Sequence, residues 1–212
     1  MTGRVVAVNL GVVTEADWAG DPSGRSGIDK RPVDGPVLLR VDGVAGDFIG
    51  ERAHHGGADQ AVYAYAEEDA AWWATELGRD IRPGGFGENL TTYAVDVTGA
   101  VIGEQWQIGS ALLQVTMPRT PCATFAGFWG VPDLIKRFTV RALPGAYLRV
   151  LREGEVGPGD PVEVVERPTH GVTIGEVFRA TTLESELLPR LLDAPDLPEP
   201  IREKVRRRLA VR

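Results

Sequence analysis

The sequence is short of several residue types, and each shortage excludes a class of protein. It has a single cysteine, Cys122, so no internal disulfide can form and the chain is not a disulfide-stabilised scaffold. Its three histidines, His54, His55 and His170, leave little choice for a hydrolase triad, and no serine lies in a nucleophile-elbow motif. A conventional Ser-His-carboxylate triad is therefore not expected.

Positive charge and long apolar runs are also scarce. The chain has 23 Lys and Arg against 30 Asp and Glu, a formal net charge of −7, whereas nucleic-acid-binding proteins usually carry a basic surface. The one concentrated basic run, residues 202–208, fits a solvated helix face. No apolar stretch reaches the roughly 18 to 20 residues that cross a bilayer, and residues 1–10 lack a secretory-signal pattern. We expect a cytoplasmic protein with neither a nucleic-acid nor a membrane partner.

Turn-forming residues are plentiful and evenly spread. The 26 glycines and 15 prolines of the 212-residue chain separate short apolar runs, a pattern typical of an all-β body. The spacing favours a barrel or sandwich over a doubly wound parallel sheet. The runs that predict strands are residues 4–10, 36–41, 61–65, 100–102, 105–108, 111–116, 146–151 and 161–165.

Helical spacing appears in three places. Ala70, Trp73 and Leu77 predict a helix over 67–79, and residues 124–138 predict helix on either side of Pro132. The third place is the chain's end, where residues 173–176 and 181–184 both fit a capping box and leucines follow at helical spacing. We therefore predict a mostly β domain over 1–170 and a small helical extension over 171–212.

The first candidate for chemistry is the stretch His54-His55-Gly56-Gly57-Ala58-Asp59-Gln60. Histidine can bind an anion, shuttle a proton or ligate a metal, and the glycines permit a close approach by another group. Adjacent histidines on a strand point to opposite faces, so one of them at most enters a given site. A turn with surface histidines explains the stretch equally well.

The second candidate is the glycine-rich stretch over residues 83–90. Its closely spaced glycines expose backbone N–H groups, which can form an anion-binding nest. Asn89 can both donate and accept hydrogen bonds, which suits a heterocyclic ligand. The stretch matches neither phosphate-loop nor dinucleotide-binding patterns, and composition alone favours a purely structural loop.

The third candidate is Cys122. A lone cysteine is usually a small buried hydrophobe. Here, however, it follows a predicted strand in a proline-rich loop, three residues after Arg119. A nearby cation lowers the pKa of a thiol and favours the thiolate, the form that binds soft metals or attacks sulfur.

Taken in order, these stretches resemble the MOSC family, named for the C-terminal domain of molybdenum-cofactor sulfurase. The resemblance covers roughly residues 27–166, and its motifs are Gly27-Ile28-Asp29-Lys30-Arg31-Pro32-Val33, Gly43-Val44-Ala45-Gly46-Asp47, residues 55–65, residues 83–92, Pro118-Arg119-Thr120-Pro121-Cys122, Tyr147-Leu148-Arg149-Val150 and Gly159-Asp160. Two departures are Gln60, where many relatives have lysine, and Ala146, where some have tryptophan.

The resemblance implies a β-barrel-like fold, molybdenum cofactor as the ligand, and Cys122 as the metal ligand. It further implies Cys122, Arg119 and His55 as catalytic residues. The residues that it implies for cofactor binding are Lys30, His55, Gly56, Gly57, Asp59, Gly87, Glu88, Asn89, Arg119 and Arg149.

Two functions follow from the resemblance. In the first, the protein is an oxidoreductase that reduces N-hydroxylated compounds at a Cys122-ligated molybdenum, as in detoxification, with electrons from a partner protein. In the second, it is a cofactor carrier or sulfur-transfer module that uses a Cys122 persulfide, with a cysteine desulfurase as its partner. Similar free-standing bacterial proteins with a helical extension favour the first.

Overall fold

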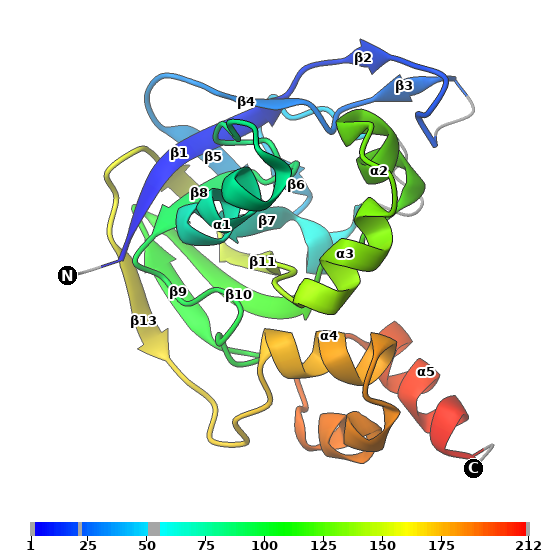
Figure 1. Ribbon diagram of the computed structural model, residues 1–212. Helices are drawn as coiled ribbons and strands as arrows, with labels where there is room; N and C mark the ends of the chain where they lie inside the picture. The colour runs from blue at the N-terminus through cyan, green and yellow to red at the C-terminus, as the bar shows by residue number, and fades with distance from the viewer. Residues whose placement is uncertain (1–2, 21–22, 51–55, 211–212) are drawn as a thin grey trace.

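The fold is built around one curved, eight-stranded sheet (Figure 1). The computed structural model describes residues 3–20, 23–50 and 56–210. The strand order is β13-β9-β10-β11-β7-β8-β1-β4, and all neighbouring pairs are antiparallel except β7 and β8. The bounds are β1 Arg4–Gly11, β4 Lys30–Pro32, β7 Val62–Ala66, β8 Leu90–Tyr93, β9 Gln105–Ile108, β10 Ala111–Pro118, β11 Ala146–Arg152 and β13 Val162–Glu166.

The sheet curls back on itself without becoming a closed barrel. The start of β1 meets the chain before β13 at one isolated bridge, Arg4 to Pro161, and Val5 N–H donates to the Asp160 carbonyl at 2.9 Å. Pairing does not continue as a ladder between β1 and β13, so the expected barrel is an incompletely closed sheet. The expected mostly β body is confirmed in part, because a mixed sheet is present but helices make up a comparable share of the described chain.

Two small sheets complete the β-structure. One has the order β12-β5-β6, with β12 at Gly154–Val156, β5 at Val37–Arg40 and β6 at Gly43–Val44. The other is the pair β2 (Thr14–Glu15) and β3 (Arg25–Ser26). The strand predicted at 100–102 is wrong, because Val101 makes only an isolated bridge with Thr173 before the chain turns.

Three helices cover the sheet near its middle. They are α1 Glu67–Leu77, α2 Ala123–Trp129 and α3 Leu134–Arg141, while η1 at Ala58–Gln60 precedes β7. Gly78 ends α1 in the left-handed conformation, φ 62°, as its place in the sequence predicts. The helices bury an aromatic cluster, in which Trp73 and Phe86 pack with Tyr65 and Phe138. This cluster supports one wall of the site described below.

The C-terminal extension consists of α4 Ile174–Thr182, η2 Ser185–Asp193 and α5 Glu199–Ala210. The Thr173 hydroxyl accepts a bond from Glu176 N–H at 3.2 Å, as the first capping box predicts. The second predicted capping box, at residues 181–184, is wrong. The Thr181 hydroxyl instead donates to the Val177 carbonyl at 2.8 Å, within the last turn of α4. Buried Val177, Leu191 and Val205 belong to the same apolar core as the sheet.

Candidate functional site

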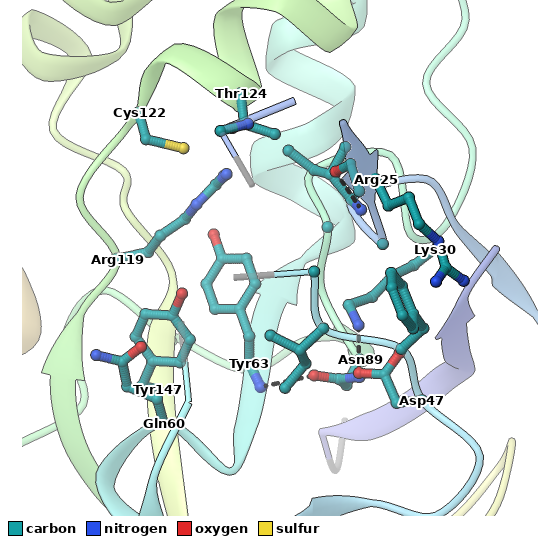
Figure 2. Close-up of a pocket in the computed structure, with 18 of the residues that line it drawn as sticks. Arg25, Lys30, Asp47, Gln60, Tyr63, Asn89, Arg119, Cys122, Thr124 and Tyr147 are labelled. Carbon is teal, nitrogen blue, oxygen red and sulfur yellow. Dashed lines mark hydrogen bonds and ion pairs between the residues drawn. The ribbon is translucent and has the colours of Figure 1, made fainter. Parts of the chain in front are cut away.

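A pocket lies between the β2–β3 hairpin, the start of α2 and the central strands β7 and β11 of the main sheet (Figure 2). It gathers side chains from segments far apart in the sequence. Five of the residues implied by the family resemblance line it, namely Lys30, Gly87, Asn89, Arg119 and Cys122. The other polar or aromatic lining residues are Arg25, Ser26, Asp47, Phe48, Gln60, Tyr63, Thr124 and Tyr147.

Cys122 lies at the point where β10 gives way to α2. The prolines at 118 and 121 lack a backbone N–H and end the strand, so the chain turns and Cys122 becomes the residue preceding α2. Its side chain is partly exposed. Figure 2 shows the guanidinium of Arg119 extending toward this thiol.

Arg119 is buried but well supported. Its Nη1 donates to the Phe86 carbonyl at 3.0 Å, and its guanidinium lies 4.3 Å from the Phe125 ring centroid and 5.5 Å from that of Tyr63. The guanidinium therefore combines one backbone hydrogen bond with two cation–π contacts. Arg119 also lines the pocket.

The charge of Arg119 is stabilised by its surroundings. Burial by itself lowers the pKa of Arg119, but the acidic groups of Tyr63, Tyr147 and Cys122 outweigh this and raise it. Burial raises the pKa of Tyr147, so its phenol keeps its proton at neutral pH. This end of the pocket thus presents a permanent cation, a neutral phenol and a thiol.

The opposite side of the pocket holds a buried ion pair. Lys30 Nζ donates to Asp47 Oδ2, and the two side chains are 9% and 5% exposed. Asn89 Nδ2 also donates to Asp47 Oδ2, at 2.9 Å, and Gly11 N–H donates to Asp47 Oδ1 at 2.7 Å. Asp47 therefore joins β1, β4 and the start of β8.

The cost of burying the charged Lys30 side chain is partly offset by its partner. Desolvation lowers the pKa of Lys30, and the carboxylate of Asp47 opposes that shift. Asn89 is fixed from its other end as well, because its Oδ1 accepts from Tyr63 N–H at 3.2 Å. The two residues line the pocket through side chains whose hydrogen bonds are already made within the protein.

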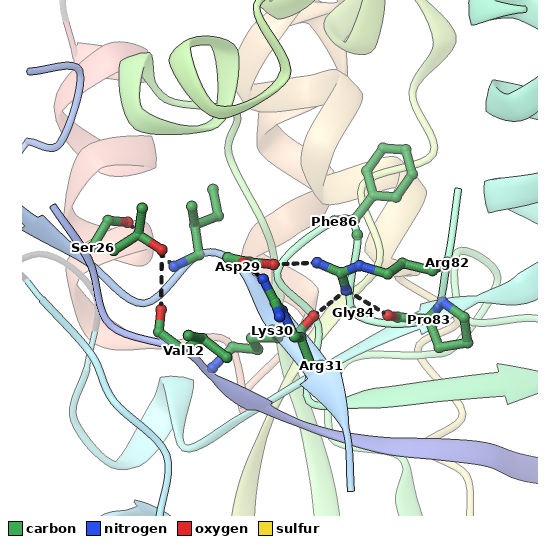
Figure 3. A network of polar contacts seen from close by, with 12 residues as sticks. Val12, Ser26, Asp29, Lys30, Arg31, Arg82, Pro83, Gly84 and Phe86 are labelled. Atoms are coloured by element: carbon green, nitrogen blue, oxygen red, sulfur yellow. Dashed lines mark hydrogen bonds and ion pairs between the residues drawn. The ribbon is translucent and has the colours of Figure 1, made fainter. Parts of the chain in front are cut away.

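A second ion-pair network lies behind Lys30 (Figure 3). Arg82 donates to the Lys30 carbonyl and to Asp29 Oδ1, and Arg31 donates to Asp29 Oδ2 at 2.8 Å. The network ties β4 to the loop before Gly84. Its effect is to hold the Lys30 backbone, and thus the ion pair, at the pocket wall.

The glycine-rich loop is structural. Glu88 accepts from Gly84 N–H at 2.6 Å, from Phe86 N–H at 2.9 Å and from the Thr91 hydroxyl at 2.8 Å. The N–H groups of Gly85 and Gly87 donate to carbonyls of the same loop. The loop's own carboxylate and carbonyls thus occupy the donors of residues 84–87, which favours the structural loop over an anion-binding nest. Burial raises the pKa of Glu88 despite these bonds.

The remaining implied site residues are placed elsewhere or are not described. Arg149 Nη2 donates to Asp59 Oδ1 at 2.5 Å, and Arg149 Nη1 donates to Gln114 at 3.3 Å. These residues, with Gly56, Gly57 and Glu88, do not line the pocket. His54 and His55 lie outside the described residues.

Several pocket residues were not singled out from the sequence. Asp47, Tyr63 and Tyr147 lie inside the motifs quoted above, but nothing in the sequence distinguished them as pocket residues. No sequence pattern indicated that Arg25 and Phe48 belong to the pocket, because they meet only when the β2–β3 hairpin packs on the segment after β6. Gln60, noted above as a departure from many relatives, lines the pocket with a buried Oε1 that has no partner among the described residues.

The pocket side chains suit the cofactor that the family resemblance implies. The described residues contain no group of three His, Cys, Asp or Glu able to hold a metal ion by themselves. They do offer one soft thiol, a buried guanidinium beside it, and an unpaired buried acceptor at Gln60. These suit a cofactor that brings its metal on its own chelate and presents N–H donors and negative charge. The residues fit.

Fold and site together define a protein with a thiol-bearing pocket beside a mixed β-sheet. The chain belongs to the MOSC domain family, whose profile matches residues 51–163 and whose members are associated with molybdenum-cofactor binding. It is 33% identical over 170 residues to the uncharacterized protein YflK of Bacillus subtilis, covering 80% of this chain and 76% of YflK.

A solved structure and a fungal protein extend the comparison. The crystal structure of YiiM from Geobacillus stearothermophilus superposes with a TM-score of 0.81 at 30% identity, covering 98% of this chain and 99% of that one. A Gibberella moniliformis protein named reductase is 29% identical over 92% of this chain but only 35% of its own length.

In the described ranges no helix is long and apolar enough to cross a membrane.

Proposed function

We propose that the protein is a molybdenum-cofactor-dependent oxidoreductase that reduces N-hydroxylated compounds, with Cys122 as the metal ligand. The observation that carries the proposal is the position of Cys122. Its thiol lies at the pocket, beside the buried cation of Arg119 and across from Lys30 and Asp47. The similarity to a protein named reductase supports the oxidoreductase role.

The chain's own residues have separable tasks in this proposal. The thiolate of Cys122 would ligate molybdenum, and Arg119 would stabilise the negative charge that ligation requires. Gln60 would accept a hydrogen bond from the cofactor's heterocycle. When bound, the cofactor supplies the two-electron chemistry that cleaves the N–O bond.

Protons must accompany those electrons. Reduction of an N-hydroxyl group to N–H and water consumes two electrons and two protons. The Tyr147 phenol, whose pKa burial raises, lines the pocket and can hold a proton and donate a hydrogen bond to a bound hydroxyl. Proton delivery from solvent through the open mouth completes the balance.

The electrons would come from a partner protein. A cysteine-ligated iron–sulfur cluster takes four protein ligands, and this chain has one cysteine. We therefore propose a separate electron-donor protein as the partner and a small N-hydroxylated molecule as the substrate.

A direct test uses protein expressed in a host that makes the cofactor. Molybdenum content, pterin fluorescence after oxidation, and reduction of benzamidoxime to benzamidine by chemically reduced methyl viologen are measured on one preparation. We expect about one molybdenum per chain and turnover, with both lost in Cys122→Ser. Folded protein that retains neither molybdenum nor pterin would exclude the proposal.

Cofactor carriage or sulfur transfer is the second candidate, favoured by the partial exposure of Cys122. The Cys122 thiolate would attack the outer sulfur of the desulfurase's cysteine persulfide, forming the Cys122 persulfide and releasing the desulfurase thiolate. Incubation with a desulfurase and cysteine, followed by mass spectrometry, would then show one added sulfur atom on Cys122. Molybdenum-loaded protein that carries this persulfide but never reduces benzamidoxime would favour the carrier.

A further inference from the structure

Arg25 stands at the rim of the pocket on the side away from Cys122 (Figure 2). It is exposed, and its guanidinium lies 5.0 Å from the centroid of the Phe48 ring. Both side chains line the pocket. An aromatic face and a cation are thus presented together to whatever enters the mouth.

The position of this pair is fixed by two close backbone approaches. A Cβ on Gly27 would lie 1.9 Å from the Phe48 carbonyl oxygen, and one on Gly50 would lie 2.5 Å from the Arg25 carbonyl oxygen. Neither position therefore accepts a side chain without moving the backbone. The segments around Arg25 and Phe48 are held against each other at both ends of the contact.

The charge of Arg25 is not neutralised within the described ranges. Among those residues, no ion pair joins Arg25 to a carboxylate, whereas Lys30 is paired with Asp47. The third pocket cation, Arg119, is on the side of Cys122. Among the described pocket residues, Arg25 and Arg119 are thus cations with no carboxylate partner, in a chain whose formal net charge is −7. Local positive charge of this kind attracts anionic ligands and orients them.

We propose that Arg25 and Phe48 form a recognition subsite for an oxyanion, a carboxylate or phosphate, attached to an aromatic or heteroaromatic group. The guanidinium binds the oxyanion through two parallel N–H donors, and the Phe48 ring packs on the aromatic part. The oxyanion belongs either to the substrate or to the cofactor's phosphate. Under the proposed function, on which this inference rests for its substrate form, the preferred substrates are anionic N-hydroxylated aromatics.

The first arm of the test needs no cofactor. Phenyl phosphate is titrated into cofactor-free protein, and its dissociation constant is measured by ligand-observed NMR for wild type, Arg25→Ala and Arg40→Ala. Arg40 is an exposed arginine on β5 that does not line the pocket, so it controls for net charge. We expect Arg25→Ala to weaken binding about tenfold or more, the usual loss for one charge-assisted contact, and Arg40→Ala to leave it unchanged. Binding that is absent, or equal in all three proteins, overturns the subsite.

The second arm separates the two sources of the oxyanion. Cofactor-loaded wild type and Arg25→Ala are compared with benzamidoxime and 4-carboxybenzamidoxime, with pterin content measured alongside. An increase of about tenfold in KM for the carboxylate alone, with pterin content unchanged, assigns the subsite to the substrate. A loss of pterin in Arg25→Ala assigns it to the cofactor's phosphate. Unchanged KM for both compounds together with unchanged pterin overturns the proposal.

The two arms also separate this inference from the proposed function. If loaded wild-type protein reduces neither compound, the oxidoreductase proposal fails, while Arg25-dependent binding of phenyl phosphate still supports the subsite. If wild type reduces benzamidoxime but Arg25→Ala matches it in every measurement, the subsite fails and the oxidoreductase stands.

Discussion

Lys30 and Asp47 form an ion pair inside the pocket wall, and each side chain is less than a tenth exposed. The carboxylate also accepts from Asn89 and from the backbone of Gly11, so one residue organises three segments of the site. Because both charges are buried, the loss of either leaves the other uncompensated.

Asp47→Ala is expected to destabilise the protein by about 3 to 5 kcal/mol, the usual cost of removing one partner from a buried pair. Urea unfolding measures it, with Asp42→Ala, an exposed aspartate in the β5–β6 turn, as the control. Burial lowers the pKa of Lys30 below 10.5 and Asp47 opposes the shift, so NMR titration should show a further decrease in Asp47→Asn. A Lys30 pKa unaffected by Asp47→Asn would contradict the pairing.

The same shift gives a pH dependence. Since the folded-state pKa of Lys30 lies below that of the unfolded chain, the unfolded state binds more protons between those two values. The Lys30 contribution to the free energy of unfolding therefore increases as pH rises toward 10.5. Unfolding measured from pH 8 to 10.5 should show a smaller slope in Lys30→Met than in wild type.

Glu88→Gln is expected to destabilise the loop by about 1 to 3 kcal/mol, because the new amide group would face backbone N–H donors. Burial raises the pKa of Glu88 above 4.5, so the folded state binds more protons between 4.5 and that higher value. The contribution of Glu88 to stability therefore decreases as pH rises through this window. Comparing wild type with Glu88→Gln across pH 4.5 to 8 isolates it, and parallel stability curves would refute the shift.

Cys122→Ser is expected to abolish metal retention while lowering the free energy of unfolding by no more than about 1 kcal/mol, because Cys122 is partly exposed and lies only at the border of the aromatic cluster. Thermal melting and molybdenum content are measured on the same sample. A buried structural cysteine would give the reverse result, with lost stability and retained metal.

Arg119→Lys keeps the charge but loses the planar group that lies over Phe125 and Tyr63. We expect it to bind cofactor more weakly than wild type, because lysine cannot reproduce both the cation–π stacking and the fixed donors. Arg119→Met, which also removes the charge, should be worse. Pterin content after identical purification ranks the three proteins, and equal retention in all would show that Arg119 has only a packing role.

Truncation after Arg167 is expected to give insoluble protein. It removes Val177, Leu191 and Val205, which share one core with the sheet, and each buried side chain contributes about 1.5 to 3 kcal/mol. Deletion of 199–212 alone should leave a soluble but less stable chain. Soluble expression and circular dichroism distinguish the results, and a folded 1–167 fragment would establish the extension as a separate unit.

The sequence by itself was enough to predict most of the local structure and to single out Cys122 as a candidate functional residue. Strands such as 4–10 and 111–116, the helix over 67–79 and the cap at Thr173 follow from periodicity and turn chemistry, which are local properties. The family resemblance and the place of Cys122 in the loop after a strand were also predicted from the sequence. Local patterns sufficed because each depends on residues a few positions apart.

Only the tertiary structure decided which polar groups face the pocket. Glu88, Asp59 and Arg149 belong to the expected set, yet each satisfies its charge or hydrogen bonds with neighbours away from the lining. Arg25 and Phe48 meet because two distant segments cross at Gly27 and Gly50. The partners of a side chain depend on long-range packing. Local sequence patterns therefore do not show whether a charged group is paired within the protein or is available to bind a ligand.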